Sequence, residues 1–174
     1  MQSAQPKDRP AQKQKAQKLW QMVQDIKIAM LTTRDSGMLR CRPMECLQVD
    51  APAGTLWFFT GASSPKTDEV DDEHEVALAF ADKTHQNYVS ISGRAKLVRD
   101  RPKARELWTE EQRAWYPEGL DDPELALLKV SVQQAEYWDR PTGEMVAAQG
   151  LVRAIADETP DLGENEKLSF EHSR

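Results

Sequence analysis

The chain has 174 residues, of which 39% are hydrophobic and 30% charged, with a net charge of −6. This length favours a single domain with a sizeable core, and the acidic balance argues against general nucleic-acid binding, which needs a basic face. No apolar run approaches the ~20 residues of a membrane span and the N-terminus lacks the apolar core of a secretory signal, so we expect a cytoplasmic protein.

The N-terminal region is predicted to be a tail followed by a helix. Residues 1–12 are polar, contain two prolines and are expected to be mobile. From Lys13 onward, apolar residues recur with the i, i+3, i+4, i+7 spacing of one helix face. They are Leu19, Met22, Val23 and Ile26. We expect this face to cover a sheet.

A β-hairpin is predicted next. Residues 28–33 read as a buried strand, and residues 35–37 form a turn in which Gly37 is free to adopt a positive φ. Residues 38–49 return as a longer strand. Pro43 interrupts that strand, which indicates an edge, a bulge or a ligand-facing gap, because proline cannot donate to a sheet ladder.

Residues 55–70 combine a short apolar strand with a helix start. Ser64 is a good N-cap and Pro65 suits the first helical position. A helix N-terminus after a strand presents free backbone N–H groups to an anion. Hydroxyl groups and one positive charge lie around it, on Thr60, Ser63, Ser64 and Lys66. The stretch therefore suits a phosphate, and the alternative is that the Ser-Pro start only caps the helix.

The middle of the chain is predicted to contain two more strands and a helix. Residues 76–81 place large apolar side chains on one face and alanines on the other, and residues 86–98 alternate clearly. Gly93 indicates a bend or bulge in the second of these strands. A helix starts near residues 100–102, and we expect its buried side to continue as far as Trp115.

The C-terminal third offers weaker patterns. Residues 128–132 alternate as a strand, which resumes at residues 137–138. Residues 145–155 have helical spacing that Gly150 weakens. The end, from Glu158, is polar and loop-like. The sum is five or six strands, mostly linked by hairpins, which favours a small antiparallel barrel with helices around it.

No pattern typical of a metal site stands out. Cys41 and Cys46 have odd spacing, so they face opposite sides of a strand and a disulfide between them is not expected. The three histidines have no zinc-like spacing to cysteine. The run 71–75, DDEHE, offers ligands for a divalent cation, but a solvated helix end is the simpler interpretation.

Taken together, six stretches resemble a known family. They are AMLTTRDSGMLRCRPM, TLWFFTGASSPKTDEV, NYVSISGRAKLVRDRPKARELW, AWYPEGLDDPELALLKV, AEYWD and GENEKLSF. In this order they resemble the split-barrel flavin proteins of the pyridoxamine 5'-phosphate oxidase superfamily, and within it the bacterial general stress proteins. The resemblance implies a mainly β fold, a six-stranded antiparallel Greek-key split β-barrel with flanking helices. Residues 13–157 would form this domain, and residues 158–174 a C-terminal extension packed on it.

The resemblance also implies a homodimer with FMN, or alternatively FAD, bound between the subunits. Carried over by position, the residues along the ring and ribityl chain would be Arg42, Pro43, Met44, Phe59 and Thr60. Ser63, Ser64 and Lys66 would hold the phosphate. Trp138 would come from the partner subunit. These residue types suit the ligand, because a phosphate attracts cations and helix N–H groups, and a flat ring suits aromatic and Met contacts.

Some of these residues have simpler interpretations. Without the family, Trp138 reads as an ordinary core tryptophan, since tryptophan is mostly buried. The same holds for Trp108 and Trp115, which we assign to a core or an interface. Arg40 shares a strand face with Arg42 and reads as a solvent-exposed charge, so it is the second choice for the charged contact.

The chain also departs from the oxidase pattern. Pro65 stands where the oxidase has an arginine in its phosphate loop, and Tyr88 where it has a glutamine. Trp138 is followed by DRPTGEMVAAQG, without the oxidase's arginine–x–histidine pair. We therefore do not expect pyridoxamine phosphate oxidation.

Two classes of function follow from the resemblance. The first is an FMN-dependent oxidoreductase of the stress-protein type with an unknown small-molecule substrate, in which the flavin carries the redox chemistry and no catalytic side chain is assigned. The alternative is a non-catalytic module that binds or buffers flavin. A third hypothesis is a barrel that holds another ligand, such as haem or a deazaflavin.

Overall fold

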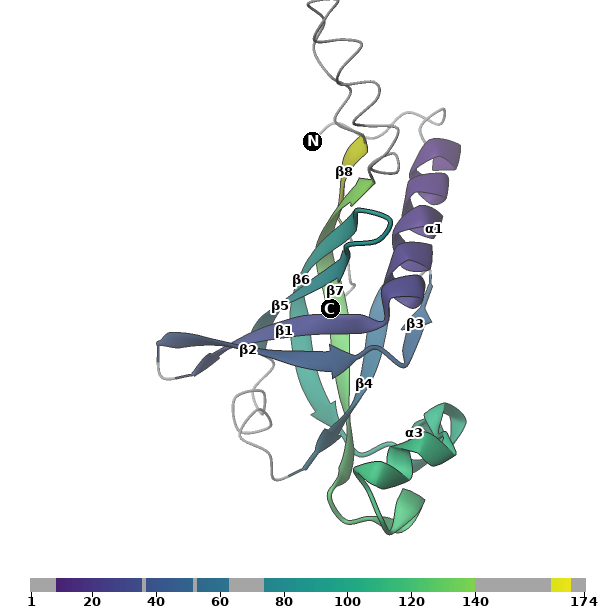
Figure 1. Ribbon diagram of the computed structural model, residues 1–174, viewed down its shortest axis with the longest axis vertical. Helices are drawn as coiled ribbons and strands as arrows, with labels where there is room; N and C mark the ends of the chain where they lie inside the picture. Colours follow the sequence, from purple (N-terminus) through teal and green to yellow (C-terminus); the bar gives the residue numbers. More distant parts are fainter. Residues whose placement is uncertain (1–8, 36, 52, 63–73, 140–163, 170–174) are drawn as a thin grey trace, which may run out of the picture.

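The computed structural model describes residues 9–35, 37–51, 53–62, 74–139 and 164–169. Within these ranges the protein is an eight-stranded antiparallel sheet with a long helix across one face and a small helical region at the lower end of the sheet (Figure 1). The strand order is β2-β1-β5-β6-β7-β4-β3, and β8 also pairs with β7. The strands are β1 (Ile28–Asp35), β2 (Met38–Glu45), β3 (Gln48–Asp50), β4 (Thr55–Gly61), β5 (His74–Asp82), β6 (Asn87–Val98), β7 (Leu125–Asp139) and β8 (Glu164–Ser169).

The mainly β, antiparallel fold is confirmed, but the expected number of six strands is wrong. The short β3 and the C-terminal β8 are the additional strands. Among the described strands, no ladder joins the two ends of the sheet, β2 and β3, so the barrel is split. The ends nevertheless come close, because the Cys46 N–H donates to the Lys27 carbonyl and the Leu47 N–H donates to the Trp57 carbonyl.

The chain crosses from β2 to β3 at residues 46–47. This crossing explains why residues 38–49 are not the single strand that we expected. The chain leaves the β1–β2 hairpin after Glu45 and starts pairing with β4 at Gln48. Pro43 lies on β2, whose outer side is the edge of the sheet, so its missing N–H costs no ladder bond. Gly37 has a φ of 86°, as the predicted turn requires.

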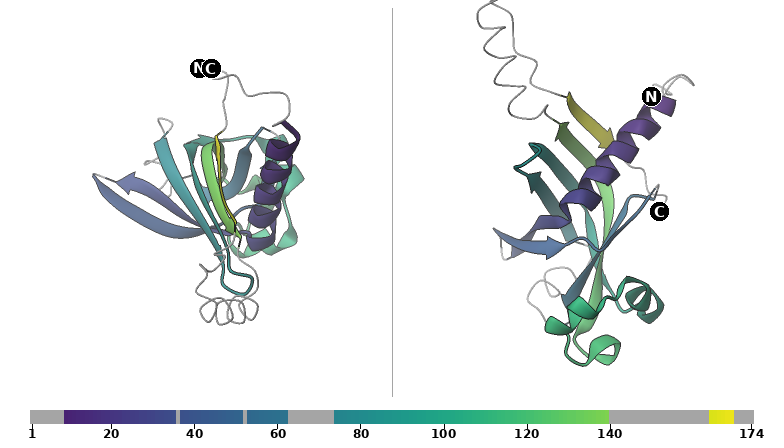
Figure 2. Two further views of the ribbon diagram at one scale, coloured as in Figure 1. Left: turned by 90° about the horizontal axis from the view of Figure 1, so that it is seen from above. Right: turned by 45° about the vertical axis from the view of Figure 1, so that its right-hand side comes forward.

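The helix α1 (Arg9–Ile26) begins four residues before the predicted start. It lies across one face of the sheet (Figure 2). Its side chains Leu19, Met22 and Val23 are buried in the main core, against inward-facing residues of the sheet. The prediction that this face covers a sheet is confirmed, and the apolar area that it buries is the main stabilising contribution of the helix.

A second core lies on the opposite face, because adjacent residues of a strand point to opposite sides. It contains Trp57 of β4, Leu127 of β7 and Ala104 of α3 (Arg101–Leu107). Asp100 caps α3, since its carboxylate accepts a hydrogen bond of 2.9 Å from the Lys103 N–H. The predicted helix start is therefore confirmed.

The predicted extent of this helix is wrong. The backbone of Trp108 is extended, which ends α3 after Leu107. Two 3-10 turns follow, η1 (Glu110–Ala114) and η2 (Gly119–Asp121). Trp115, which we expected on the buried side of a continuous helix, is 79% exposed as a result.

The alternation of β6 and its irregularity at Gly93 are both confirmed. Its residues alternate between exposed and buried along the strand, and the pairing with β7 shifts register between Ser92 and Gly93. A Cβ on Gly93 would lie 2.5 Å from the Ser131 carbonyl oxygen. Gly93 is therefore required by the close approach of the two backbones.

The C-terminal part differs most from the expectation. β7 is one continuous strand of 15 residues instead of two segments. Residues 164–169, expected as a loop, form β8 beside the upper half of β7 (Figure 1), and Leu168 packs against the main core. The helix start predicted at Ser64, the helical spacing at residues 145–155, and the domain boundaries at residues 12 and 157 stay predictions, because residues 1–8, 63–73 and 140–163 lie outside the description.

Candidate functional site

A cavity of about 410 Å³ lies where the β1–β2 hairpin meets β4 and residues 110–121, which contain the two 3-10 turns and are called the 3-10 segment below. It is lined by Ile28, Pro43, Met44, Glu45, Leu47, Phe59, Gln112, Trp115 and Tyr116. Three of the predicted ligand contacts, Pro43, Met44 and Phe59, are therefore brought together. They come from two strands that are not neighbours in the sheet, so the crossing at residues 46–47 creates this site.

Aromatic contacts hold one wall of the cavity in place. The Phe59 ring meets the edges of Trp108 and Tyr116, with centroid distances of 6.0 and 6.1 Å and interplanar angles of 63° and 64°. Such edge-to-face pairs contribute about 0.5–1.5 kcal/mol each beyond area burial. Phe59 is thus fixed by side chains of a segment more than forty residues away in the sequence.

The 3-10 segment contributes a polar group and an exposed ring. The N–H groups of Trp115 and Tyr116 both donate to the Gln112 carbonyl, at 3.0 Å each. Gln112 is only 9% exposed, whereas its neighbour Trp115 is the most exposed large hydrophobic residue of the described chain. Burial, and then the carboxylates of Asp122 and Glu124, raise the pKa of Tyr116 to about 12, so this phenol stays neutral near pH 7.

Two further predicted contacts, Arg42 and Thr60, are not among the residues that line this cavity. The Arg42 guanidinium donates a hydrogen bond to the buried Thr33 hydroxyl, which ties β2 to β1. Thr60 follows Phe59 on β4. Its hydroxyl is buried and has no hydrogen-bond partner within the described ranges. A buried polar group without a partner is costly, so this one is a candidate for a contact with a ligand or with residues 63–73.

Trp138 is not brought to the cavity within one chain. It pairs with Tyr88 across β6 and β7, whereas Phe59 pairs with Leu127. Trp138 lies eleven positions after Leu127 on the same strand, which corresponds to roughly 36 Å. If Trp138 contributes to the site, it must come from another subunit.

The predicted phosphate end of the site, Ser63, Ser64 and Lys66, lies outside the described residues. Its flanks are described. The Ala62 N–H donates to the Glu124 carbonyl at 2.7 Å, directly after β4. Sequence and structure therefore agree that a strand leads directly into the predicted phosphate loop.

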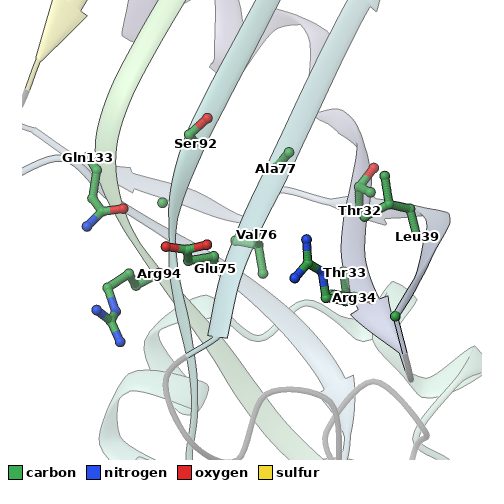
Figure 3. Close-up of a pocket in the computed structure, with 12 residues that line it drawn as sticks. Thr32, Thr33, Arg34, Leu39, Glu75, Val76, Ala77, Ser92, Arg94 and Gln133 are labelled. Carbon is green, nitrogen blue, oxygen red and sulfur yellow. The ribbon is translucent and has the colours of Figure 1, made fainter.

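A larger and more polar cavity, of about 860 Å³, opens on the face of the sheet that α1 does not cover. Figure 3 shows its charged side chains on neighbouring strands, with Glu75 between Arg34 and Arg94. None of its lining residues is aromatic or a predicted ligand contact. Thr33, which accepts the hydrogen bond from Arg42, lines this larger cavity.

Comparison with known proteins identifies the family. The family model described as pyridoxamine 5'-phosphate oxidase like matches residues 14–161. The chain belongs to this family. Within it, the resemblance to the general stress proteins is also borne out.

Three similar proteins illustrate the relationship. A general stress FMN/FAD binding protein from Xanthomonas citri is 30% identical, with a TM-score of 0.66 over 73% of this chain and 89% of that one. A candidate general stress protein 26 from Jannaschia is 25% identical, with a TM-score of 0.76 over 91% of this chain and 99% of that one. Among curated proteins, the protein bli-3 of Neurospora crassa is 27% identical over 83% of this chain and 70% of its own length.

For this member of the oxidase-like family, sequence reasoning missed several residues of the cavity. Gln112 and Tyr116 were given no role, and Trp115 was assigned only to a core or an interface. The sequence contained a signal for two of them, because Trp115 and Tyr116 belong to AWYPEGLDDPELALLKV, one of the stretches that carry the family resemblance. It was not interpreted because a continuous helix to Trp115 placed these residues in a core.

No group of three or more His, Cys, Asp or Glu residues with metal-binding geometry occurs in the described part of the chain. Within the same residues, no helix is both long and apolar enough to cross a membrane.

Proposed function

We propose that this protein binds FMN, with FAD as the alternative, and that the cavity of Pro43, Met44 and Phe59 receives the isoalloxazine ring. The observation that carries the proposal is that these three residues, separated in sequence and in the sheet, line one cavity. Its volume lies in the range of small-molecule sites, and its aromatic, proline and methionine lining suits a flat ring. The buried Thr60 hydroxyl, which has no partner within residues 53–62 or the other described ranges, is a further polar contact.

The remaining contacts follow from the family. Ser63, Ser64 and Lys66 would hold the phosphate, with Arg42 as a charged contact nearby. A homodimer with the flavin between its subunits accounts for Trp138, which is too distant from the cavity in its own chain. The relative from Xanthomonas citri, which binds FMN or FAD, supports the choice of ligand.

The bound flavin would supply redox chemistry, and we propose an oxidoreductase of small molecules as the activity. The residues of this chain would position the ring and exclude water from it. A non-catalytic flavin-binding or flavin-buffering module is the second candidate. It is favoured by the sequence after Trp138, which lacks the histidine of the oxidase pattern. Continuous oxidation of a reduced nicotinamide by the loaded protein supports the enzyme, and its absence with every donor supports the module.

An absorption spectrum tests the flavin site. The purified chain is mixed with FMN, excess ligand is removed, and a retained and shifted flavin band is expected. A colourless protein contradicts the proposal.

Lys66→Ala tests the phosphate end of this site. It should weaken FMN binding by about 1–3 kcal/mol, because a charge-assisted hydrogen bond to the phosphate is lost. Isothermal titration measures the Kd. Lys83→Ala, which removes an exposed lysine in the turn between β5 and β6, is the matched control and should leave the Kd unchanged. Equal effects of the two substitutions would remove Lys66 from the site.

A further inference from the structure

The cavity beside the 3-10 segment is lined by a single carboxylate, that of Glu45. No Lys, Arg or His occurs among its described lining residues. Glu45 is the last residue of β2 and is exposed. Within the described ranges its carboxylate makes no ion pair and no hydrogen bond. The negative charge of Glu45 is therefore available to a ligand that enters this cavity.

Further negative charge acts on the opposite wall of the cavity. Burial is the first cause of the raised pKa of Tyr116, about 12, and the carboxylates of Asp122 and Glu124 are the next causes. These two carboxylates lie close enough to the cavity-lining phenol to act on it. Because both walls experience negative charge and no cation lines the cavity, a positively charged ligand is attracted and a negatively charged one is repelled.

The remaining lining of the cavity also suits a cation. Phe59, Trp115 and Tyr116 contribute three aromatic rings, and the faces of such rings attract cations, most strongly in tryptophan. The Trp115 ring is 79% exposed, so its surface is free to contact a ligand. Its backbone is held in place, because its N–H donates to the Gln112 carbonyl at 3.0 Å. Aromatic rings around a cavity are the usual means of recognising substituted ammonium groups.

We propose that the mouth of this cavity, where the exposed Glu45 and Trp115 lie, binds an organic cation such as a substituted ammonium or pyridinium group. Glu45 supplies the opposite charge, and Trp115 supplies a ring face. The small molecule that reacts beside the flavin then carries a positive charge. This role as a substrate rests on the proposed flavin function, whereas binding of the cation depends only on residues of the chain.

Two probes of similar shape and opposite charge test the site. Benzyltrimethylammonium is the cation, and benzylsulfonate is the anion. The Kd of each probe is measured by NMR titration of the chain without flavin and of the chain loaded with FMN. The wild-type chain should bind the cation about fivefold or more tightly than the sulfonate in both forms, because one exposed charge pair and one cation–π contact favour it.

Three variants connect this preference to the named residues. Glu45→Gln should weaken binding of the cation about two- to fivefold and leave the sulfonate unchanged or bound more tightly. Trp115→Ala should weaken the cation about two- to fivefold through the lost cation–π contact, and Trp115→Phe should restore part of the affinity. Glu75→Gln is the matched control, because it removes the same charge but lies in the other cavity. Glu45 and Trp115 are both exposed, so we expect their variants to fold.

The outcomes separate this inference from the flavin proposal. Equal affinity of the wild-type chain for the two probes overturns the cation site, even if the chain retains FMN. A preference that Glu45→Gln and Glu75→Gln change equally overturns it as well, because it then reflects the net charge alone. Loss of cation binding on loading with FMN contradicts the role as a substrate. In a chain that does not bind FMN, a preference that depends on Glu45 and Trp115 upholds the cation site and overturns the flavin proposal.

Discussion

Two buried threonine hydroxyls have opposite environments. The Thr33 hydroxyl accepts a hydrogen bond from Arg42, whereas the Thr60 hydroxyl has no partner in the part of the chain that the structure describes. Both side chains are only 1% exposed. Because they share chemistry and burial, they form a matched pair for separating a structural hydroxyl from a ligand-binding one.

Replacing each threonine by valine tests this difference at the residue scale. Thr60→Val should leave the unfolding free energy of the flavin-free chain unchanged or raise it by about 1–3 kcal/mol, because an unsatisfied buried hydroxyl is removed. It should also weaken FMN binding about three- to tenfold, the loss expected for one hydrogen bond. Urea unfolding and titration with FMN are the two measurements.

Thr33→Val is the control for this pair. It should lower the unfolding free energy by about 1–3 kcal/mol, because the Arg42 donor loses its acceptor. A Thr60→Val chain that is destabilised to the same degree and binds FMN normally would show that the Thr60 hydroxyl is structural.

At the scale of elements, the irregular pairing of β6 and β7 depends on one glycine. The register shift at Gly93 brings its Cα so close to Ser131 that no side chain fits. The neighbouring Ser92 faces outward and is exposed.

Gly93→Ala should therefore destabilise the protein strongly. A Cβ at 2.5 Å from a backbone oxygen forces the two strands apart, and we expect a loss of about 2–4 kcal/mol in unfolding free energy. Ser92→Ala, one position earlier on the exposed face, should change it by less than about 0.5 kcal/mol. Thermal and urea unfolding measure both. Equal stability of the two variants would mean that the strands separate here at little cost.

At the scale of the whole molecule, the β1–β2 hairpin protrudes from the body of the described structure (Figure 1). The side chains near its turn are apolar and exposed. Met38 and Leu39 are 68% and 73% exposed, and Ile28 and Met30 on β1 are also exposed. Apolar area of this kind is typical of an interface between proteins. In the homodimer proposed above, a second copy of the chain would cover this area.

Light scattering of the purified chain tests the dimer, which we expect at micromolar concentration. Leu39→Glu should shift the mass toward the monomer and weaken FMN binding, because a charge buried at the interface without a partner is unfavourable. Gln17→Glu adds the same charge on the exposed side of α1 and should leave the dimer intact. A monomeric wild-type chain would contradict the dimer and, with it, the role of Trp138 in the site.

Local patterns predicted most of the elements of this fold. The alternation of β6, the apolar face of α1, the turn at Gly37 and the cap at Asp100 each depend on neighbours within a few residues, so the sequence was sufficient to find them. The same patterns failed where an element ends for a non-local reason. The end of α3 at Leu107 and the continuity of β7 depend on the strands and turns packed against them.

For the candidate site, the sequence alone determined the family resemblance and three residues that share the cavity, Pro43, Met44 and Phe59. Only the tertiary structure decided that Gln112 and Trp115 join them and that Trp138 of the same chain does not. The reason is physical. Side-chain type and spacing fix what a residue can contact along its own element, whereas the crossing at residues 46–47 and the turn after α3 decide which elements meet.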